Sequence, residues 1–189
     1  GRIFRIAPEK SLAEDWPGRY GNLGELSDFE LIKLQRSKSA WHARRARIIL
    51  QNRSLKRPMK TADVDELKNY FRRSDIDPDH RLRAMWTMHV TGNMEKTELI
   101  SSLTPNSNND EYIRAWAIQM LCEDKNPTRA TLERFAEMAK SDPSPVVRLY
   151  LASALQRIPD AESVMAIGSG LVAHAEDADD HNIPKLLWY

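Results

Sequence analysis

The sequence lacks several features that would indicate a particular class of enzyme. Cys122 is its only cysteine, which excludes an internal disulfide and a Cys-x-x-Cys metal or haem attachment within these residues. No run of about 18 apolar residues occurs, the length that a membrane-spanning helix needs. A glycine-rich phosphate loop and a Ser-His-Asp order are also absent. We therefore expect no catalytic residue, cofactor or metal in this segment, and we expect Cys122 to be a buried structural thiol.

Charge is unevenly distributed along the chain, although the net charge is only +1. Residues 1–73 carry 17 Lys and Arg against 9 Asp and Glu, whereas residues 74–189 carry 11 against 18, which gives +8 and −7. This asymmetry is compatible with a solvated surface, a basic ligand surface near the N-terminus, or two ends that face differently charged neighbours. The near-neutral total makes nucleic acid an unlikely partner, because phosphate neutralisation dominates such binding.

One phrase recurs four times: an arginine preceded by a small or aliphatic residue and followed by an apolar helical pattern. The four arginines lie roughly 30 to 40 residues apart, a period typical of stacked helical pairs; they are Arg44, Arg83, Arg114 and Arg148. The period predicts an all-α chain, a right-handed α-α superhelix of the solenoid type. We expect the four arginines to form a ladder along one side of the array, contacting acidic or carbonyl groups of their own or adjacent units.

Local signals predict where the helices begin and end. Ser27 and Glu30 have the spacing of a capping box, so the first helical pair should begin at Ser27. Asp77-Pro78 and Ser144-Pro145 each combine an N-cap residue with proline at the first helical position, and Gly92 suits the left-handed conformation after a helix. Further helices are expected over about 40–52, 61–71, 94–103, 113–120 and 161–176, with another opened by Asn126-Pro127 and another starting at about 181.

The N-terminal residues differ in character from the rest. Residues 1–6 are short and β-prone, and residues 7–25 contain prolines and glycines, so we expect residues 1–25 to be the end of an upstream domain followed by a non-helical linker. Residues 26–189 are then an array of about four and a half helical pairs. The apolar end at Leu186, Leu187, Trp188 and Tyr189 is unlike a polar terminal cap, so we expect the array to be truncated there.

Several phrases resemble known families. Residues 77–84 and 142–149 resemble HEAT-like repeats, in which an Asp-Pro turn starts the second helix and an arginine lines a ladder. Residues 1–6 resemble the closing strand of a six-bladed β-propeller. Residues 180–189 resemble a signature of large exported bacterial proteins of the membrane-bound dehydrogenase type, carried by Asp180, His181, Asn182, Pro184, Trp188 and Tyr189, whose role is unknown.

The resemblance implies a place for this segment in a larger protein. Such proteins resemble a sugar- or sorbosone-dehydrogenase-like propeller followed by HEAT-like repeats and a c-type cytochrome domain. The chain would then be the middle of that arrangement, a noncatalytic scaffold or interaction module without a cofactor of its own. Haem c would belong elsewhere in the parent protein, and the parent would be exported, periplasmic or membrane-associated. Its partners would be neighbouring domains of the same polypeptide or another protein.

Three groups of residues are candidate chemical sites. Asp75, Asp77 and Asp79 alternate like the start of a calcium loop, but that loop would need glycine in place of His80 and glutamate in place of Trp86, so helix capping is expected. His89 lies in an apolar pattern and is expected to be a packed core histidine. Residues 174–181 include two histidines and three aspartates, for which a helix-terminus loop is expected over a metal or catalytic site.

The tryptophans offer an alternative function. Trp41, Trp86 and Trp116 each lie on a second helix near the recurring arginine. They could form an aromatic and cationic inner groove, as in HEAT-like DNA glycosylases, with the basic N-terminal half binding nucleic acid. Core packing is the simpler expectation for Trp86 and Trp116.

Overall fold

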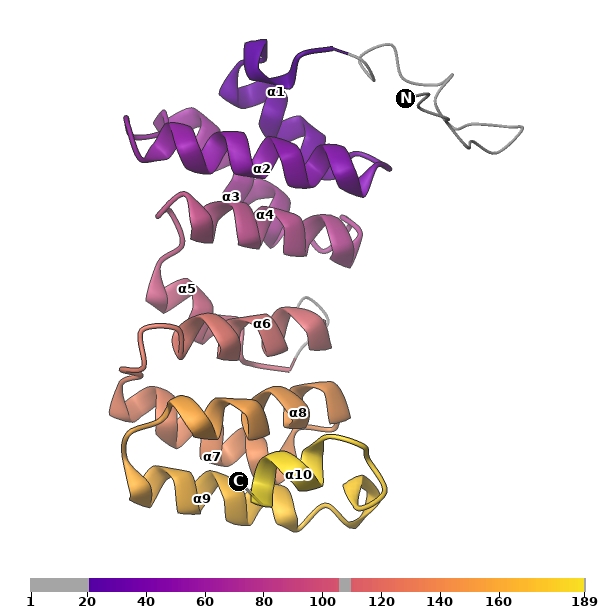
Figure 1. The fold of residues 1–189 in the computed structure, drawn as a ribbon, viewed down its shortest axis with the longest axis vertical. Helices are drawn as coiled ribbons and strands as arrows, with labels where there is room; N and C mark the ends of the chain where they lie inside the picture. The colour runs from indigo at the N-terminus through magenta and orange to yellow at the C-terminus, as the bar shows by residue number, and fades with distance from the viewer. Residues whose placement is uncertain (1–20, 106–109, 189) are drawn as a thin grey trace, which may run out of the picture.

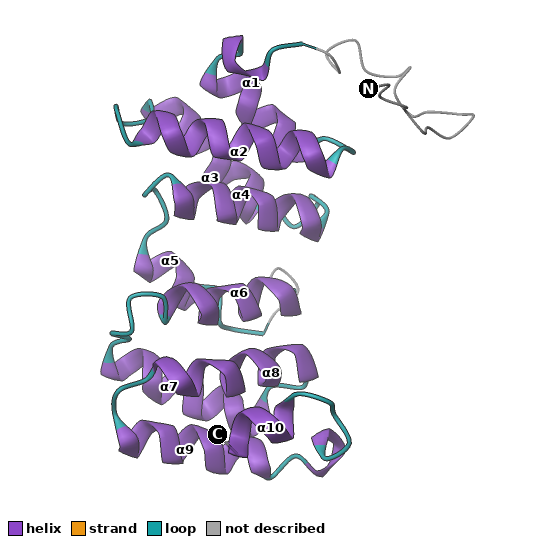
Figure 2. Cartoon of the chain, viewed as in Figure 1, coloured by secondary structure: helices purple, strands orange, loops and turns teal. Residues whose placement is uncertain are grey.

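The computed structural model describes residues 21–105 and 110–188, and the following description concerns these residues. They are helical throughout, with loops between the helices and no strand in the described ranges (Figure 2). The strand expected at residues 1–6, most of the expected linker and Tyr189 lie outside them. No described helix has the length and apolar character needed to cross a membrane.

The helices form packed pairs that follow one another along the long axis of the molecule (Figure 1). Successive even-numbered helices pack on one another from α2 to α10, and α1 packs on α3 and α7 on α9 in the other layer. The α-helices are α1 (Asp28–Lys33), α2 (Ala40–Ser54), α3 (Thr61–Arg72), α4 (Pro78–Val90), α5 (Lys96–Ser101), α6 (Glu111–Leu121), α7 (Arg129–Ser141), α8 (Pro145–Ala154), α9 (Ala161–Val172) and α10 (Ile183–Trp188). Four 3-10 turns are also described: η3 (Leu23–Glu25), η4 (Leu34–Arg36), η5 (Leu155–Arg157) and η6 (Ala175–Asp177).

Capping residues set many of the helix boundaries. Ser27 accepts from the Glu30 amide, and the Glu30 carboxylate accepts from the Ser27 amide at 2.8 Å, which confirms the capping box of α1. Asp77 caps α4 and Ser144 caps α8, with proline at the first position of both helices, as expected. Gly92 follows α4 with φ of +73°, the left-handed conformation predicted for it.

Other boundaries differ from the expectation by a few residues. α7 begins at Arg129 instead of at Asn126-Pro127, because the Thr128 side chain accepts from the Thr131 amide and so provides the N-cap. α5 is shorter than residues 94–103, and α9 ends at Val172, after which the chain forms the short turn η6. These are differences at helix ends, where local hydrogen bonds decide the boundary.

One continuous hydrophobic core runs through the stack. Each helix contributes residues at helical spacing, and the largest fully buried side chains include Leu31, Leu67, Met85, Ile113 and Phe135. Leu23, in the segment expected to be a linker, is also buried in this core. Arg53 of α2 donates to the carbonyls of Gly24 and Leu26 at 2.8 Å, so the described end of that segment is fixed to the first helical pair.

Candidate functional site: a groove along the even-numbered helices

The structure divides the four recurring arginines into two groups. Arg114 and Arg148 are each the fourth residue of their helix, and both are buried. Arg83 is instead the sixth residue of α4 and Arg44 the fifth residue of α2, so the four do not share one helical position. In α4 the fourth residue is Arg81, which is buried like Arg114 and Arg148. The repeated position is therefore occupied by Arg81, Arg114 and Arg148, which are 33 and 34 residues apart.

The buried arginines join one helical pair to the next. Arg114 donates to both Asp142 oxygens at 2.9 Å, and Asp142 lies in the loop before α8. Arg148 donates to Asp177 of η6 at 2.5 and 2.7 Å, and this pairing raises the pKa of the Arg148 guanidinium. A bidentate arginine–carboxylate pair fixes orientation as well as distance. Each contact joins the second helix of one pair to a non-α-helical segment of the next pair.

Arg81 has a related environment. Its Nε donates to the Phe71 carbonyl at 2.9 Å, and it lies in the field of Asp110, the residue that caps α6. Burial lowers the pKa of Arg81, and the Asp110 charge opposes that effect. In each case the acidic residue lies 28 or 29 residues after its arginine, which gives a second repeated signal in the sequence.

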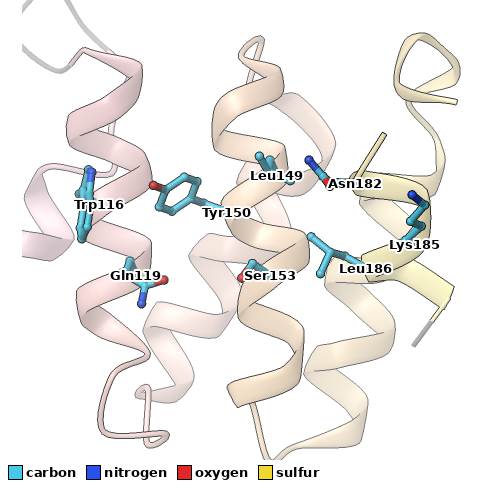
Figure 3. A pocket seen from close by; sticks show the side chains of 8 residues that line it. All are labelled: Trp116, Gln119, Leu149, Tyr150, Ser153, Asn182, Lys185 and Leu186. Atoms are coloured by element: carbon cyan, nitrogen blue, oxygen red, sulfur yellow. The ribbon is translucent and has the colours of Figure 1, made fainter. Parts of the chain in front are cut away.

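A groove follows the even-numbered helices and is formed by two cavities that share Trp116 and Gln119; we call it the even-helix groove. The cavity nearer α10 has a volume of about 500 Å³ and is mostly apolar. Figure 3 shows side chains of α6, α8 and α10 around this space. Its lining residues are Trp116, Gln119, Leu149, Tyr150, Ser153, Asn182, Lys185 and Leu186.

The cavity nearer α2 has a volume of about 460 Å³ and is more polar at one end. It is lined by Arg44, Arg47, Trp86, His89, Val90, Trp116, Gln119, Met120 and Glu123. His89 Nε2 and a Glu123 carboxylate oxygen are 2.5 Å apart, joining α4 to the end of α6. The expectation that His89 is a packed core histidine is therefore wrong, because the side chain is half-buried and faces this cavity.

Aromatic rings connect the two cavities. Trp86 and Trp116 meet edge to face with ring centroids 5.0 Å apart, and Trp116 and Tyr150 are 6.2 Å apart in a tilted arrangement. The Arg47 guanidinium carbon lies 5.1 Å from the Trp86 ring centroid, a cation–π distance. The core-packing expectation for the two tryptophans holds in part, since both pack against the core and are also half-buried in the groove.

The α2 end of the groove carries positive charge that the described residues do not neutralise. Arg44 is exposed, and neither Arg44 nor Arg47 forms an ion pair or hydrogen bond with any residue in the described ranges. Burial, together with the charges of Arg44 and Arg83, lowers the pKa of Arg47. The Arg83 guanidinium donates to the Ser37 carbonyl at 2.7 Å. It therefore provides Arg47 with a further positive charge and no hydrogen-bond acceptor.

Two donors at this end lack an acceptor. Nη1 of Arg47 and Nε1 of Trp86 are both shielded from solvent, and neither has a hydrogen-bond partner among the described atoms. A buried polar group without a partner carries a desolvation penalty of about 1–3 kcal/mol. The two donors belong to side chains that lie against each other and line the same cavity.

The remaining candidate residues have structural roles. Asp77 caps α4, as expected for the aspartates at 75–79. Cys122 is fully buried, and burial raises the pKa of its thiol to about 11, which makes it a poor nucleophile at neutral pH. Among the described residues, no group of three His, Cys, Asp or Glu side chains is placed to hold a metal ion.

The acidic segment before α10 is organised by hydrogen bonds to its own surroundings. Asp177 binds Arg148, and His174 Nε2 lies 2.9 Å from the Ala139 carbonyl oxygen. Asp180 accepts from the amides of Asn182 and Ile183 at 2.8 Å, and these hydrogen bonds hold the pKa of Asp180 below its usual range.

The other residues of the dehydrogenase-type motif are separated by the structure. Asn182 lines the cavity nearer α10, while His181 is exposed beside Lys185. Pro184 is half-buried in the first turn of α10, and Trp188 is 87% exposed. The motif thus contributes one residue, Asn182, to the groove.

Sequence reasoning missed Tyr150, Gln119, Ser153 and Arg47 as groove residues. A signal for three of them is present once the register is taken from Arg81, Arg114 and Arg148. The residues two and five positions after Arg114 are Trp116 and Gln119, and those after Arg148 are Tyr150 and Ser153; all four line the groove.

A scan against protein-family models, a search of curated proteins and a search of solved structures each found no match to this chain.

Proposed function

We propose that this chain is a right-handed solenoid of HEAT-like repeats that serves as a noncatalytic scaffold. The observation that carries the proposal is the agreement between two repeated sets of residues. Arg114 and Arg148, at one helical position, connect successive pairs, and the residues two and five positions after each of them line the even-helix groove. A helical array with these properties presents an extended binding surface on one side.

The groove has the dimensions of a site for an extended peptide. Packed helices lie about 8–10 Å apart, so four steps from α2 to α10 cover roughly 32–40 Å. An extended chain rises about 3.3 Å per residue, so such a groove accommodates roughly ten to twelve residues. The occupant in this proposal is a segment of a neighbouring domain or of another protein, with apolar side chains placed on Trp116, Tyr150 and Leu186.

Nucleic acid fits the groove less well. Of the residues lining the two cavities, Arg44, Arg47 and Lys185 are the only lysines or arginines, and they lie at opposite ends. A strand of nucleic acid needs cations along its backbone and open aromatic faces for its bases. Arg47 lies over the ring of Trp86, and Trp86 and Trp116 pack against each other.

The proposal retains the larger context implied by the sequence resemblance. There the scaffold belongs to an exported or membrane-associated protein of the dehydrogenase type, with haem c elsewhere in the parent. Reading the genomic sequence on both sides tests this part: a propeller upstream and Cys-x-x-Cys-His downstream support it, and the absence of both contradicts it.

Selection of peptides tests the binding function directly. A phage-displayed library of random twelve-residue peptides is selected on the purified chain, and the enriched peptides are measured by fluorescence anisotropy. Ser153→Trp fills the groove without removing a core side chain, so it should abolish binding. Ser169→Trp, at an exposed position on α9, is the matched control and should bind normally. Enriched peptides that bind both variants equally would show that the groove is not the site.

A further inference from the structure

Arg47 differs from the other shielded arginines in having no acceptor. Arg114 and Arg148 each hold a carboxylate, while Arg81 donates to a backbone carbonyl. Arg53, which is half-buried, holds Asp28 at 2.7 Å. A guanidinium removed from water without an acceptor is costly, so an acceptor supplied by a ligand would recover that cost.

The surroundings of Arg47 indicate what kind of acceptor is missing. Arg44 adds a second positive charge on the wall of the same cavity, and Trp86 adds a second unpaired donor. Glu123, an acid that also lines the cavity, is paired with His89 of α4. Three groups that donate hydrogen bonds or attract negative charge, Arg44, Arg47 and Trp86, therefore line the same cavity of about 460 Å³.

We infer that Arg44, Arg47 and Trp86 form a carboxylate-binding subsite that takes an Asp or Glu side chain of the peptide bound in the even-helix groove. This inference rests on the proposed function and adds the charge and direction of the ligand. The carboxylate pairs with the guanidinium of Arg47 and with Arg44, and the indole N–H of Trp86 completes the donor set after a small rotation of the side chains. Arginine suits this role because its planar donors match a carboxylate.

The groove also fixes where the rest of the peptide lies. Trp116 belongs to α6 and Tyr150 to α8, the second and third even-numbered helices after α2. Figure 3 shows both side chains. The distances from Arg47 to Trp86, from Trp86 to Trp116 and from Trp116 to Tyr150 are 5.1, 5.0 and 6.2 Å. At about 3.3 Å per residue, the apolar anchors therefore lie within roughly five residues of the acidic one. The ligand is therefore acidic at the α2 end and apolar at the α8 end.

Parallel peptide selections test the inference. The random twelve-residue library is selected on the wild-type chain and on the double variant Arg44→Gln/Arg47→Gln. Arg45→Gln is the matched control, because Arg45 is exposed on the same helix and does not line the cavity. Wild type and Arg45→Gln should enrich peptides with Asp or Glu within about five residues of an apolar pair. The double variant should lose the acidic preference while retaining the apolar one.

Binding of one enriched peptide gives the quantitative result. Loss of a charge-assisted pair corresponds to roughly a tenfold to hundredfold weaker affinity in the double variant, against less than about twofold in Arg45→Gln. Replacing the peptide's acidic residue by Gln should weaken wild-type binding equally and leave the double variant unchanged.

The outcomes separate the inference from the proposed function. Enriched peptides that are blocked by Ser153→Trp but lack an acidic residue overturn the carboxylate subsite and leave the groove function standing. A twelve-nucleotide poly-dT strand that binds the wild type more tightly than any enriched peptide, with Ser153→Trp blocking it, overturns both in favour of nucleic acid. Failure to enrich any peptide sensitive to Ser153→Trp contradicts the proposed function itself.

Discussion

Two pairs of arginines, one in each half of the molecule, have different roles. In the half from α6 to α10, Arg114 and Arg148 are buried and hold carboxylates of the following pair. In the half from α1 to α4, Arg44 and Arg47 line a cavity and form no ion pair with any of the described residues. Arginine therefore stabilises the contact between helical pairs at Arg114 and Arg148. At Arg44 and Arg47 its charge is available to a ligand. Predictions at Arg148 and Arg47 test this difference directly, and those at Gly170 and Asp28 test the packing and ion pairing around it.

The largest effect is expected where a buried arginine is removed. Arg148→Met leaves the Asp177 carboxylate buried without its partner, so the free energy of unfolding should fall by about 3–5 kcal/mol. Urea denaturation followed by circular dichroism measures this change. The double variant Arg148→Met/Asp177→Leu should recover most of the loss, because both charges are then gone. Arg129→Met removes an exposed ion pair with Glu133 and should leave the free energy of unfolding nearly unchanged. Equal losses in Arg148→Met and Arg129→Met would show that the buried pair of Arg148 with Asp177 is not what stabilises the stack.

Close packing between α7 and α9 gives the next effect. A Cβ atom at Gly170 would lie 3.0 Å from the Ala139 Cβ and 3.1 Å from the Ala139 backbone carbon. Gly170→Ala should therefore lower the free energy of unfolding by about 1–3 kcal/mol, since the helices must separate. Gly168→Ala is the control on the same helix, with no atom within 4 Å of its Cβ, and alanine should stabilise the helix there by up to about 1 kcal/mol. A neutral Gly170→Ala variant would show that this contact is loose.

An acid-dependent effect is expected in the N-terminal half. Burial opposes ionisation of Asp28, but hydrogen bonds from Arg53 and Arg57 outweigh it and hold the pKa of Asp28 below its usual value. The ionised form therefore favours folding above the unfolded pKa of about 3.9, and this contribution is lost as the pH falls through the folded value.

Asp28→Asn measures this contribution. It should cost about 1–2 kcal/mol at pH 7, and the difference from wild type should shrink toward zero in acid below about pH 3.9. Urea midpoints at pH 7 and pH 3 give both values. Asp65→Asn, at an exposed position of α3, should show little effect at either pH. A cost for Asp28→Asn that persists unchanged in acid would mean that the charge is not responsible.

The smallest effect on stability is expected at Arg47. Arg47→Met removes a cation that has no acceptor and keeps much of the apolar packing on Trp86, so the free energy of unfolding should change by no more than about 1 kcal/mol. Urea denaturation beside Arg148→Met makes the comparison direct. A loss as large as that of Arg148→Met would show that Arg47 has a structural role and would remove the contrast between the two halves.

Local chemistry explains the features that the sequence predicted well. The capping box at Ser27, the Asp77-Pro78 and Ser144-Pro145 helix starts and the turn at Gly92 each depend on residues within a few positions of one another. The hydrophobic pattern likewise predicted an all-helical chain with packed pairs. The handedness and solenoid path remain predictions.

The sequence determined the helices and the recurrence of arginine, because caps and apolar spacing act within one helix. Only the tertiary structure decided which arginines face a neighbouring pair and which face the groove. Successive side chains are rotated by about 100° around a helix. Arg83 comes two residues after Arg81, so the two side chains lie on nearly opposite faces. Arg81 is buried toward the Phe71 carbonyl, whereas Arg83 reaches back to Ser37. The spacing of the repeat can be read from the sequence, whereas contacts between helices decide which arginine of each unit is the buried one.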